Sequence, residues 1–173
     1  MGEAQPFPAE KLVVAVLLSE PADKAPLLAA LEARFGPTDW VSPELDFVWS
    51  HYYDAELGTP ITRFFVSCRT PVDPALLAEI KRTTNELERE FSRGGRRRVN
   101  LDPGLLSLSR FVLASTKPSA HRVALAGGIY AEIELVFERG SFRPVEWTYP
   151  DYRSAEYLDI LLHIRGLLKT AGG

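Results

Sequence analysis

The chain has 173 residues, of which 46% are hydrophobic and 25% are charged, and its formal net charge is −3. This composition excludes a disordered or fibrous protein, and the length suffices for one domain with a substantial core. The negative charge argues against a general nucleic-acid coat, so RNA or phosphate binding requires a local basic patch. We therefore expect a single α+β domain over residues 1–173, with flexible ends at 1–10 and 170–173.

The sequence features that report on location favour the cytoplasm. Cys68 is the single cysteine, so the chain forms no intramolecular disulfide. No run reaches the roughly 18 apolar residues of a membrane span. Residues 1–10 lack the basic and apolar regions of a signal peptide. We expect a cytoplasmic protein that has no membrane partner.

The first half of the chain alternates between strand and helix patterns. The apolar, valine-rich run at 11–18 predicts a strand buried on both faces. Apolar residues at helical spacing between Leu27 and Phe35 predict a helix that stops at Gly36. The β-rich stretches at 40–49 and 61–69 then predict a hairpin.

A second helix follows the predicted hairpin. Asp73 and Pro74 supply an N-cap and a first-turn proline, and five apolar residues form one stripe: Leu76, Leu77, Ile80, Leu87 and Phe91. Because the next apolar segment begins at Val99, the order becomes βαββαβ. That order predicts a ferredoxin-like core.

The second half predicts an antiparallel extension of this sheet. Asp102-Pro103-Gly104 has the composition of a β-turn. Residues 129–137 alternate between apolar and polar, which predicts a strand with Tyr130, Glu132 and Glu134 on one face. Ser154 caps a last helix that runs toward the C-terminus. The expected architecture is thus a ferredoxin-like core, an antiparallel β-hairpin region and a C-terminal helix.

Four strings carry a resemblance to a known family: TNELE at 84–88, RRVNLDPG at 97–104, GIYAE at 128–132 and WTYPDYR at 147–153. On these strings the chain resembles an uncharacterised prokaryotic family, domain of unknown function 4416. Some members carry a "GTP-binding protein" label, but this chain has no G-x-x-x-x-G-K-[ST] loop. The resemblance therefore implies membership without implying an activity.

A cluster of basic residues is the first candidate site. Arg97 and Arg98 follow the second helix, and His121 and Arg122 come later in the chain. The planar guanidinium binds phosphate or carboxylate oxygens in pairs, and a histidine titrates near neutral pH and can act as a general acid. The alternative is that the arginines are solvated cations that interact with a helix C-terminus.

Polar residues at strand positions form the second candidate site. Asn100 and Asp102 are two residues apart, so in a strand both side chains point to one side. Asp102 and Glu132 are candidate catalytic groups, together with His121, and candidate oxygen ligands for magnesium. The alternatives are a turn role for Asp102 and a solvated strand face for Glu132.

The aromatic loop at 147–153 is the third candidate. Trp147 and Tyr149 can stack on a base or sugar, while Asp151 and Arg153 provide polar contacts. The alternative is an aromatic plug that covers one end of the sheet. Two residues complete the candidate ligand-binding set: Asn85 in the first family string and Tyr130 beside Glu132.

Two functional hypotheses remain open, and neither decides whether the protein is an enzyme. The first is a pocket for a phosphorylated or nucleotide-like small molecule, in which magnesium-assisted phosphoester or phosphoryl chemistry is an extension. The second is a non-enzymatic interaction module, either a homodimeric regulator or a weak RNA-binding protein, because sheets of this kind serve all these roles. The two differ in whether the basic, acidic and aromatic segments converge on one concave surface.

Overall fold

A computed structural model describes residues 2–171, in which helices and strands are interspersed. The helices are α1 (Lys24–Phe35), α2 (Asp54–Leu57), α3 (Leu77–Glu90) and α4 (Ala155–Ala171). The strands are β1 (Lys11–Leu18), β2 (Thr38–Val41), β3 (Leu45–Asp46), β4 (Thr62–Cys68), β5 (Val99–Leu106), β6 (Arg110–Ser115), β7 (Val123–Ala124), β8 (Tyr130–Glu138) and β9 (Ser141–Pro144).

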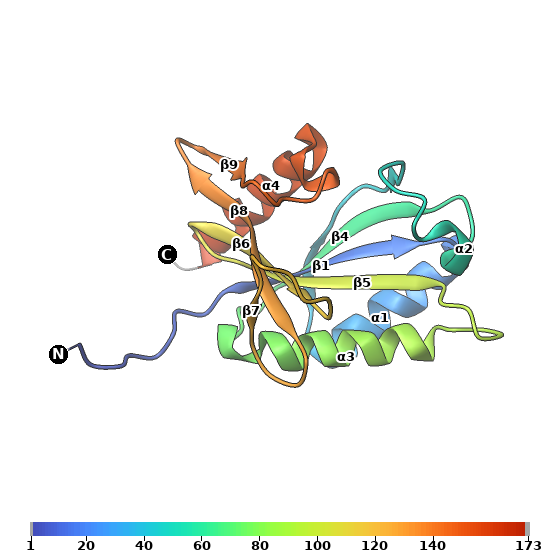
Figure 1. Cartoon of the computed structure of the whole chain (residues 1–173), viewed down its shortest axis with the longest axis horizontal. Coiled ribbons are helices and arrows are strands. Elements are labelled where there is room, and N and C mark those ends of the chain that lie inside the picture. The colour runs from blue at the N-terminus through green and yellow to red at the C-terminus, as the bar shows by residue number, and fades with distance from the viewer. Residues whose placement is uncertain (1, 172–173) are drawn as a thin grey trace.

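The strands form one antiparallel sheet, so the predicted α+β class is confirmed. Its order is β2-β4-β1-β5-β6-β8-β7, with β3 also paired to β4 and β9 to β8. The strands β6, β8 and β9 turn away from the plane of β4, β1 and β5 (Figure 1). No helix among residues 2–171 combines the length and apolar character needed to cross a membrane.

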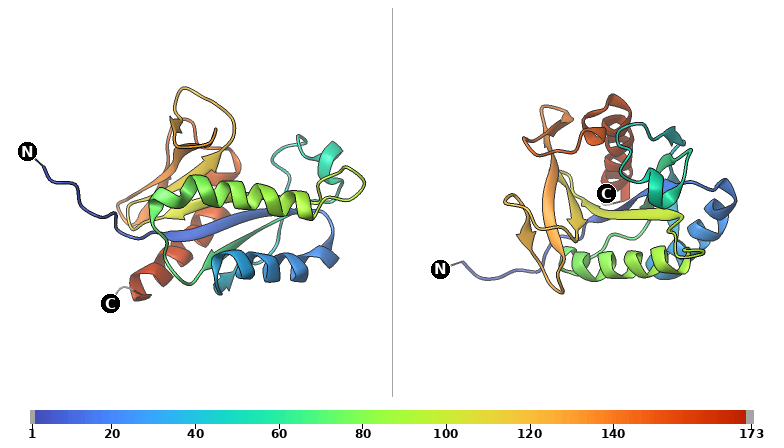
Figure 2. Two further views of the ribbon diagram at one scale, coloured as in Figure 1. Left: turned by 90° about the horizontal axis from the view of Figure 1, so that it is seen from below. Right: turned by 45° about the vertical axis from the view of Figure 1, so that its right-hand side comes forward.

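The central strand β1 separates two hydrophobic layers. Its even-numbered residues, such as Val14 and Val16, belong to the core that it shares with α1 and α3. Its odd-numbered residues, such as Val13, face the core built with α4. Both α1 and α3 lie on one side of the sheet, and α4 lies on the other (Figure 2). Full burial on both faces explains why this strand is apolar from Leu12 to Leu18 instead of alternating.

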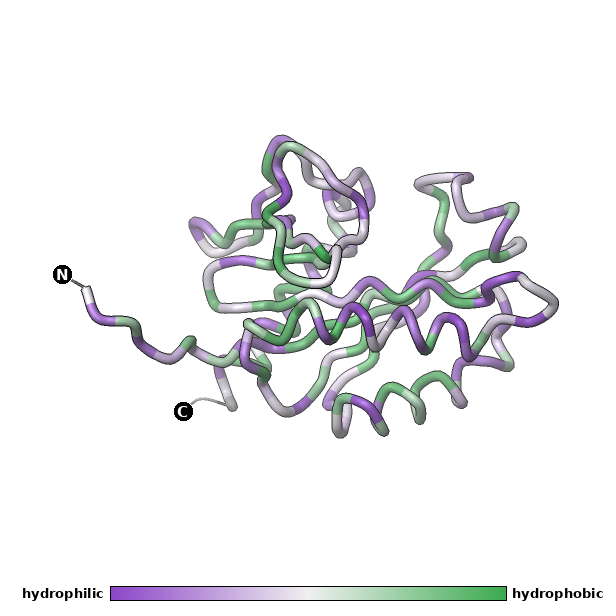
Figure 3. The backbone as a smooth tube through the Cα atoms, turned by 60° about the horizontal axis from the view of Figure 1, so that its bottom comes forward, coloured by the Kyte–Doolittle hydropathy of each residue, from purple (hydrophilic) through white to green (hydrophobic). Residues whose placement is uncertain are grey.

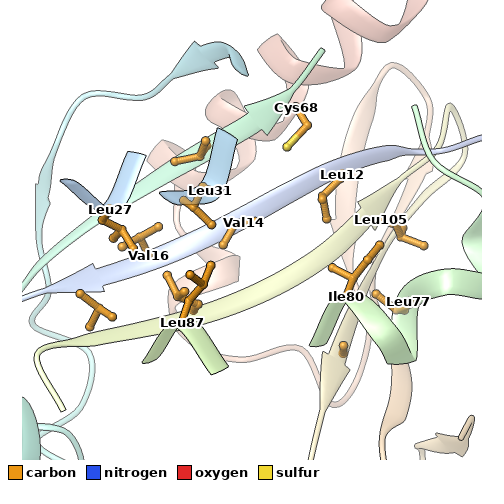
Figure 4. Packing of buried hydrophobic residues seen from close by; sticks show 14 of the residues in the cluster. Leu12, Val14, Val16, Leu27, Leu31, Cys68, Leu77, Ile80, Leu87 and Leu105 are labelled. Atoms are coloured by element: carbon orange, nitrogen blue, oxygen red, sulfur yellow. The ribbon is translucent and has the colours of Figure 1, made fainter. Parts of the chain in front are cut away.

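Apolar side chains from the helices meet the sheet at close range. Leu31 of α1 and Leu87 of α3 lie beside Val14 of β1 (Figure 4), and all three are at most 1% exposed. Burying a side chain of this size contributes about 1.5–3 kcal/mol. The tube of α3 alternates between hydrophobic and hydrophilic residues (Figure 3), as expected for a helix with one buried face. The predicted stripe is therefore confirmed at Leu77, Ile80 and Leu87, whereas Leu76 is 44% exposed and lies in the 3-10 turn before α3.

The ends of the chain differ in structure. Residues 2–9 form no helix or strand and extend away from the sheet (Figure 1). Glu10 is already fixed by a β-bridge to Val72. Helix α4 continues to Ala171, so residues 170–171 are helical. Positions 1, 172 and 173 of the predicted flexible ends lie outside the described residues.

The predicted turn at Asp102-Pro103-Gly104 is wrong, because β5 runs straight through it. Pro103 pairs with Val14 and Gly104 with Val13 of β1. At Gly104 a Cβ atom would lie 2.5 Å from Cζ of Phe111 and 2.7 Å from the Val112 carbonyl oxygen. Glycine is needed there for the close approach of β6, and not for a turn.

The predicted solvated face of β8 is also wrong. Glu132 is 3% exposed and Glu134 is fully buried, whereas Ile133 is 42% exposed. The register between β6 and β8 shifts between Phe111 and Val112, so Glu134 is an extra residue in the ladder. Such a bulge turns side chains away from the faces that simple alternation assigns. Glu132 precedes the bulge, and His121 and Arg122 cover its carboxylate.

Candidate functional site

The candidate site lies where β6 separates from β5. Strand β6 pairs only with Gly104–Leu106, so residues 99–103 of β5 have a partner strand on the β1 side alone. Helix α3 covers the backbone at that open edge: Lys81 Nζ donates to the Leu101 carbonyl at 2.7 Å, and Glu88 Oε1 accepts from the Leu101 N–H at 2.7 Å. Side chains therefore replace the missing strand and leave room for a cleft.

The cleft has a volume of about 670 Å³, which is in the range of small-molecule sites. Seven residues that the sequence singled out line it: Asn85, Arg97, Asn100, Asp102, Glu132, Tyr149 and Asp151. They come from α3, β5, β8 and the loop before α4, and from the segment that joins α3 to β5. The acidic and aromatic segments and one of the arginines thus meet on one concave surface.

A buried arginine forms the floor of the cleft. Arg63 is 3% exposed, and its Nη1 and Nη2 atoms lie 3.7 Å and 3.5 Å from carboxylate oxygens of Asp102 and Asp151. Burial raises the pKa of Asp151, although the nearby Arg63 acts in the opposite direction. The Nε and Nη1 atoms of Arg63 have no hydrogen-bond partner among residues 2–171. Both atoms are closed to solvent, so the guanidinium contributes charge to the floor and not open donors.

Asp102 is held by donors from three directions. Asn100 Nδ2 donates to its Oδ2 atom at 2.7 Å. Lys81 Nζ lies 3.5 Å from its Oδ1 atom, and Arg63 approaches from behind. The Asp102 side chain is 28% exposed, so it reaches the cleft as a supported, accessible carboxylate. This is the arrangement expected of a hydrogen-bond acceptor or general base.

Arg97 joins three parts of the chain. It makes a bidentate pair with Glu56 of α2, with Nε–Oε1 and Nη2–Oε2 distances of 2.5 Å. Its Nη1 atom also donates to Glu88 at 2.6 Å and to Asn100 at 3.2 Å. Burial raises the pKa of Glu88, and the nearby Lys81 acts in the opposite direction. The guanidinium of Arg97 is therefore occupied by protein carboxylates.

Arg98 does not belong to the cleft. Its Nε lies 2.8 Å from Asp23 and its Nη2 lies 3.3 Å from Glu20, in the segment before α1. Neighbouring residues of an extended segment point to opposite sides, which separates Arg98 from Arg97. The predicted cluster of adjacent arginines is thus divided between two sets of ion pairs.

His121, Arg122 and Glu132 form one wall together. Glu132 accepts from His121 Nε2 at 2.7 Å and pairs with Arg122 Nη2 at 2.9 Å. Arg122 also donates to the Tyr149 hydroxyl at 2.6 Å. The His121 ring stacks on Trp147 at a centroid distance of 5.1 Å. Of this group only Glu132 and Tyr149 line the cleft, so His121, Arg122 and Trp147 stand behind them.

Two further predicted residues also lie outside the cleft lining. Arg153 donates to the carbonyl oxygens of Val145, Glu146 and Thr148, so it holds its own loop in shape. Tyr130 pairs with Ser115 and Ala124 within the sheet. Part of the aromatic loop thus packs as a plug, whereas Tyr149 and Asp151 face the cleft.

Glu134 fixes the position of Tyr149. Its Oε1 atom accepts from the Tyr149 N–H at 2.6 Å, and its backbone carbonyl accepts from the Thr148 hydroxyl at 2.5 Å. Burial raises the pKa of Glu134 to about 8, although the Tyr149 hydrogen bond acts in the opposite direction. The carboxyl group is therefore largely protonated at neutral pH.

The mouth of the cleft carries aromatic rings and cations. Trp49 and Tyr52 are 45% and 63% exposed, and Lys117 Nζ lies 4.4 Å from the centre of the Tyr52 ring. Arg89 lines the opposite wall, on α3. Neither Arg89 nor Lys117 forms an ion pair with any residue in the described part of the chain.

The residues do not form a metal cage. Within 2–171 no group of three or more His, Cys, Asp or Glu side chains is placed to hold a metal ion. Glu132 is already engaged by His121 and Arg122, which leaves Asp102 as the accessible carboxylate of the predicted pair. Magnesium bound here would have to take most of its ligands from water and from phosphate oxygens of a bound molecule.

The sequence pointed to the cleft but missed part of its floor. Arg63 interrupts the otherwise apolar and aromatic β4, and a lone charge in such a strand is a usable signal. Lys81 and Glu88 are seven residues apart on α3 and share one face. Nothing in the local sequence indicates that this face covers the open edge of β5, because the edge exists only once β6 has separated.

The strings at 84–88, 97–104, 128–132 and 147–153 contribute most of the cleft residues named above. Residues 8–167 match the model of one family, described as a domain of unknown function (DUF4416). No curated protein and no solved structure gave a significant match. The chain therefore belongs to the DUF4416 family, as the four strings predicted.

Proposed function

We propose that the cleft binds a phosphorylated, nucleotide-like small molecule. The observation that carries this proposal is the charge of the cleft. Five cations line it (Arg63, Lys81, Arg89, Arg97 and Lys117) against four carboxylates (Glu88, Asp102, Glu132 and Asp151). The protein as a whole has a net charge of −3. The lining therefore carries a formal charge of +1 in an acidic protein, which favours an anionic ligand.

The mouth supports an anionic group beside a planar ring. Lys117 and Arg89 are the cations of the cleft that form no ion pair within residues 2–171. Charge-assisted hydrogen bonds to phosphate contribute about 1.5–3 kcal/mol each. Tyr52 and Trp49 present exposed rings at the same entrance, and aromatic rings stack on nucleobases at about 1–3 kcal/mol per base.

The alternative of an RNA-binding surface has weaker support. Arg97 and Arg98, two of the three arginines in the run, already pair with carboxylates. An enclosed cleft also suits a small molecule better than an extended strand. Catalysis is a separate extension of the proposal, in which Asp102 would act as a base on a ligand hydroxyl.

Calorimetric titration with adenosine 5′-monophosphate (AMP) tests the proposed function. We expect binding to the wild-type protein, and an affinity at least about tenfold lower for the Arg89→Ala, Lys117→Ala double variant. Arg82→Ala with Lys169→Ala is the matched control, because both side chains are exposed, lie outside the cleft and change the net charge equally. Absence of AMP binding, or equal loss in both double variants, would contradict the proposal.

We also propose that β1, α1, β2, β4, α3 and β5 form a ferredoxin-like core. The support is their spatial order β2-β4-β1-β5, antiparallel throughout, with α1 and α3 on one face (Figure 2). That order places β4 between β2 and β1, as the split βαβ arrangement requires. A solved structure that superposes with this topology checks the assignment.

A further inference from the structure

The floor of the cleft differs chemically from its mouth. At the floor, Arg63 and Lys81 carry two positive charges, and Asp102 and Asp151 carry two negative charges when ionised. These four groups balance, so the floor offers no net attraction for an anion. The mouth has Lys117 and Arg89, whose charges no carboxylate neutralises within residues 2–171. This difference in charge between floor and mouth orients a ligand that carries phosphate at one end, with the phosphate at the mouth.

The floor contains the buried guanidinium of Arg63. Arg63 is only 3% exposed, and its Nε and Nη1 atoms have no hydrogen-bond partner in the described part of the chain. The carboxylates of Asp102 and Asp151 lie 3.5–3.7 Å from it, beyond a short hydrogen bond. Both atoms are closed to solvent, so Arg63 acts on the floor through the charge of its guanidinium and not through open donors.

The same floor also offers acceptors. Asp102 receives one hydrogen bond, from Asn100, and its side chain is 28% exposed. An ionised carboxylate has about four acceptor sites, so Asp102 retains capacity for a donor. A group that donates to Asp102 and carries no charge matches this balanced floor. A hydroxyl group has these properties, whereas a phosphate would meet two carboxylates.

We infer that the cleft takes a sugar phosphate unit, free or within a nucleoside monophosphate. Its hydroxyl groups turn inward to Asp102 and Asp151, and its phosphate turns outward to Lys117 and Arg89. This inference rests on the proposed function and adds the sugar and its direction. It makes Asp102 and Asp151 the residues that recognise the hydroxyl groups.

A pair of ligands tests the inference on the wild-type protein. AMP and 2′,3′-dideoxyadenosine 5′-monophosphate share the base and the phosphate, and only AMP has the two ring hydroxyls. Calorimetric titration is expected to give AMP an affinity roughly ten- to a hundredfold higher, because hydrogen bonds to charged groups are lost with the hydroxyls. Equal affinities overturn the inference and leave the proposed function standing. If neither ligand binds, both fall.

Variants of Asp102 and Asp151 test whether these carboxylates cause the preference for the ligand with ring hydroxyls. Asp102→Asn and Asp151→Asn keep the size of the side chain and remove its charge. In each we expect the affinity ratio of the two ligands to fall to less than about half its wild-type value, while the dideoxy ligand keeps its affinity. Asp159→Asn, on the exposed side of α4, is the control and keeps the full ratio. An unchanged ratio in both cleft variants overturns the inference.

Ribose 5-phosphate and inorganic phosphate separate the two sources of the sugar. If ribose 5-phosphate binds more tightly than inorganic phosphate, the sugar contributes without a base, which supports the inference for a free sugar phosphate. If AMP binds more tightly than both inorganic phosphate and the dideoxy ligand, while ribose 5-phosphate binds no more tightly than inorganic phosphate, the hydroxyls act within a nucleoside monophosphate. Far-ultraviolet circular dichroism of every variant verifies that the fold is retained.

Discussion

Arg63 shows how one residue can define a site. Its strand otherwise carries aromatic and aliphatic side chains, and its guanidinium ends between Asp102 and Asp151 with two nitrogen atoms unpaired among residues 2–171. A charge in such a position is costly unless it is paired and hydrogen-bonded. The sequence contained this signal, but only the fold shows that the charge faces a cleft.

Glu134 makes stability depend on pH. Burial raises its pKa to about 8, from 4.5 for an unperturbed glutamate. The folded protein therefore keeps a proton on Glu134 that the unfolded chain releases, so the contribution of Glu134 to stability is most favourable below pH 4.5 and is lost as pH rises through 8. The slope from this group is at most about 1.4 kcal/mol per pH unit.

Urea denaturation from pH 5.5 to 8.5 measures this effect. We expect Glu134→Gln to lose less of its free energy of unfolding over that range than the wild-type protein, because a glutamine stays neutral. Glu138→Gln, on the exposed end of β8, serves as the control and should follow the wild type. Parallel curves for the wild type and Glu134→Gln would contradict the assignment.

Gly104 tests why β5 contains a glycine. An alanine Cβ would lie 2.5 Å from the Phe111 ring and 2.7 Å from a backbone oxygen, so Gly104→Ala should lower the free energy of unfolding by about 1–3 kcal/mol. Gly166→Ala in α4 provides a contrast, since its Cβ would meet no described atom within 4 Å. That change should stabilise the protein by about 0.5–1 kcal/mol. Chemical denaturation that gives both the same sign would refute the packing explanation.

At the scale of elements, local patterns predicted the layers and failed at two strand details. The uniform apolar run of β1 and the stripe on α3 predicted elements that the structure confirms. Asp102-Pro103-Gly104 has turn composition, yet pairing with β1 keeps it extended. In β8, the face expected to be solvated is covered by His121, Arg122 and Tyr149. Both errors arise because long-range contacts override local propensity.

Arg97 should connect α2 to the rest of the molecule. It pairs with Glu56 of α2, Glu88 of α3 and Asn100 of β5. Replacing it with methionine leaves the Oε2 atom of Glu88, whose side chain is 7% exposed, without the hydrogen bond from Arg97. We expect a loss of about 1–3 kcal/mol in the free energy of unfolding, and faster hydrogen exchange at the α2 amides of Leu57 and Gly58.

The control for this element is Arg96→Ala, which removes an exposed arginine that has no ion pair in the described chain. Hydrogen exchange measured by NMR should leave α2 unchanged in that variant. Equal protection of Leu57 and Gly58 in Arg97→Met and the wild type would show that α2 is held by its apolar contacts alone.

At the scale of the whole molecule, the cleft depends on the point at which β6 separates from β5. Strands β5 and β6 share only three paired positions before they separate, and α3 side chains cover the exposed backbone. Residues as distant in sequence as Phe47 and Tyr152 then border one space. The sequence identified seven of the lining residues, but their convergence required the sheet register.

The binding of a phosphorylated ligand in this cleft is the central claim, and an NMR titration tests it most directly. AMP added to ¹⁵N-labelled protein should shift amide signals at 47–53, 81–89, 113–117 and 149–152, which border the cleft. Amides of α1 and of the outer face of α4 should stay unchanged and serve as internal controls. Shifts confined to residues outside the cleft, or no shifts at millimolar AMP, would contradict the account.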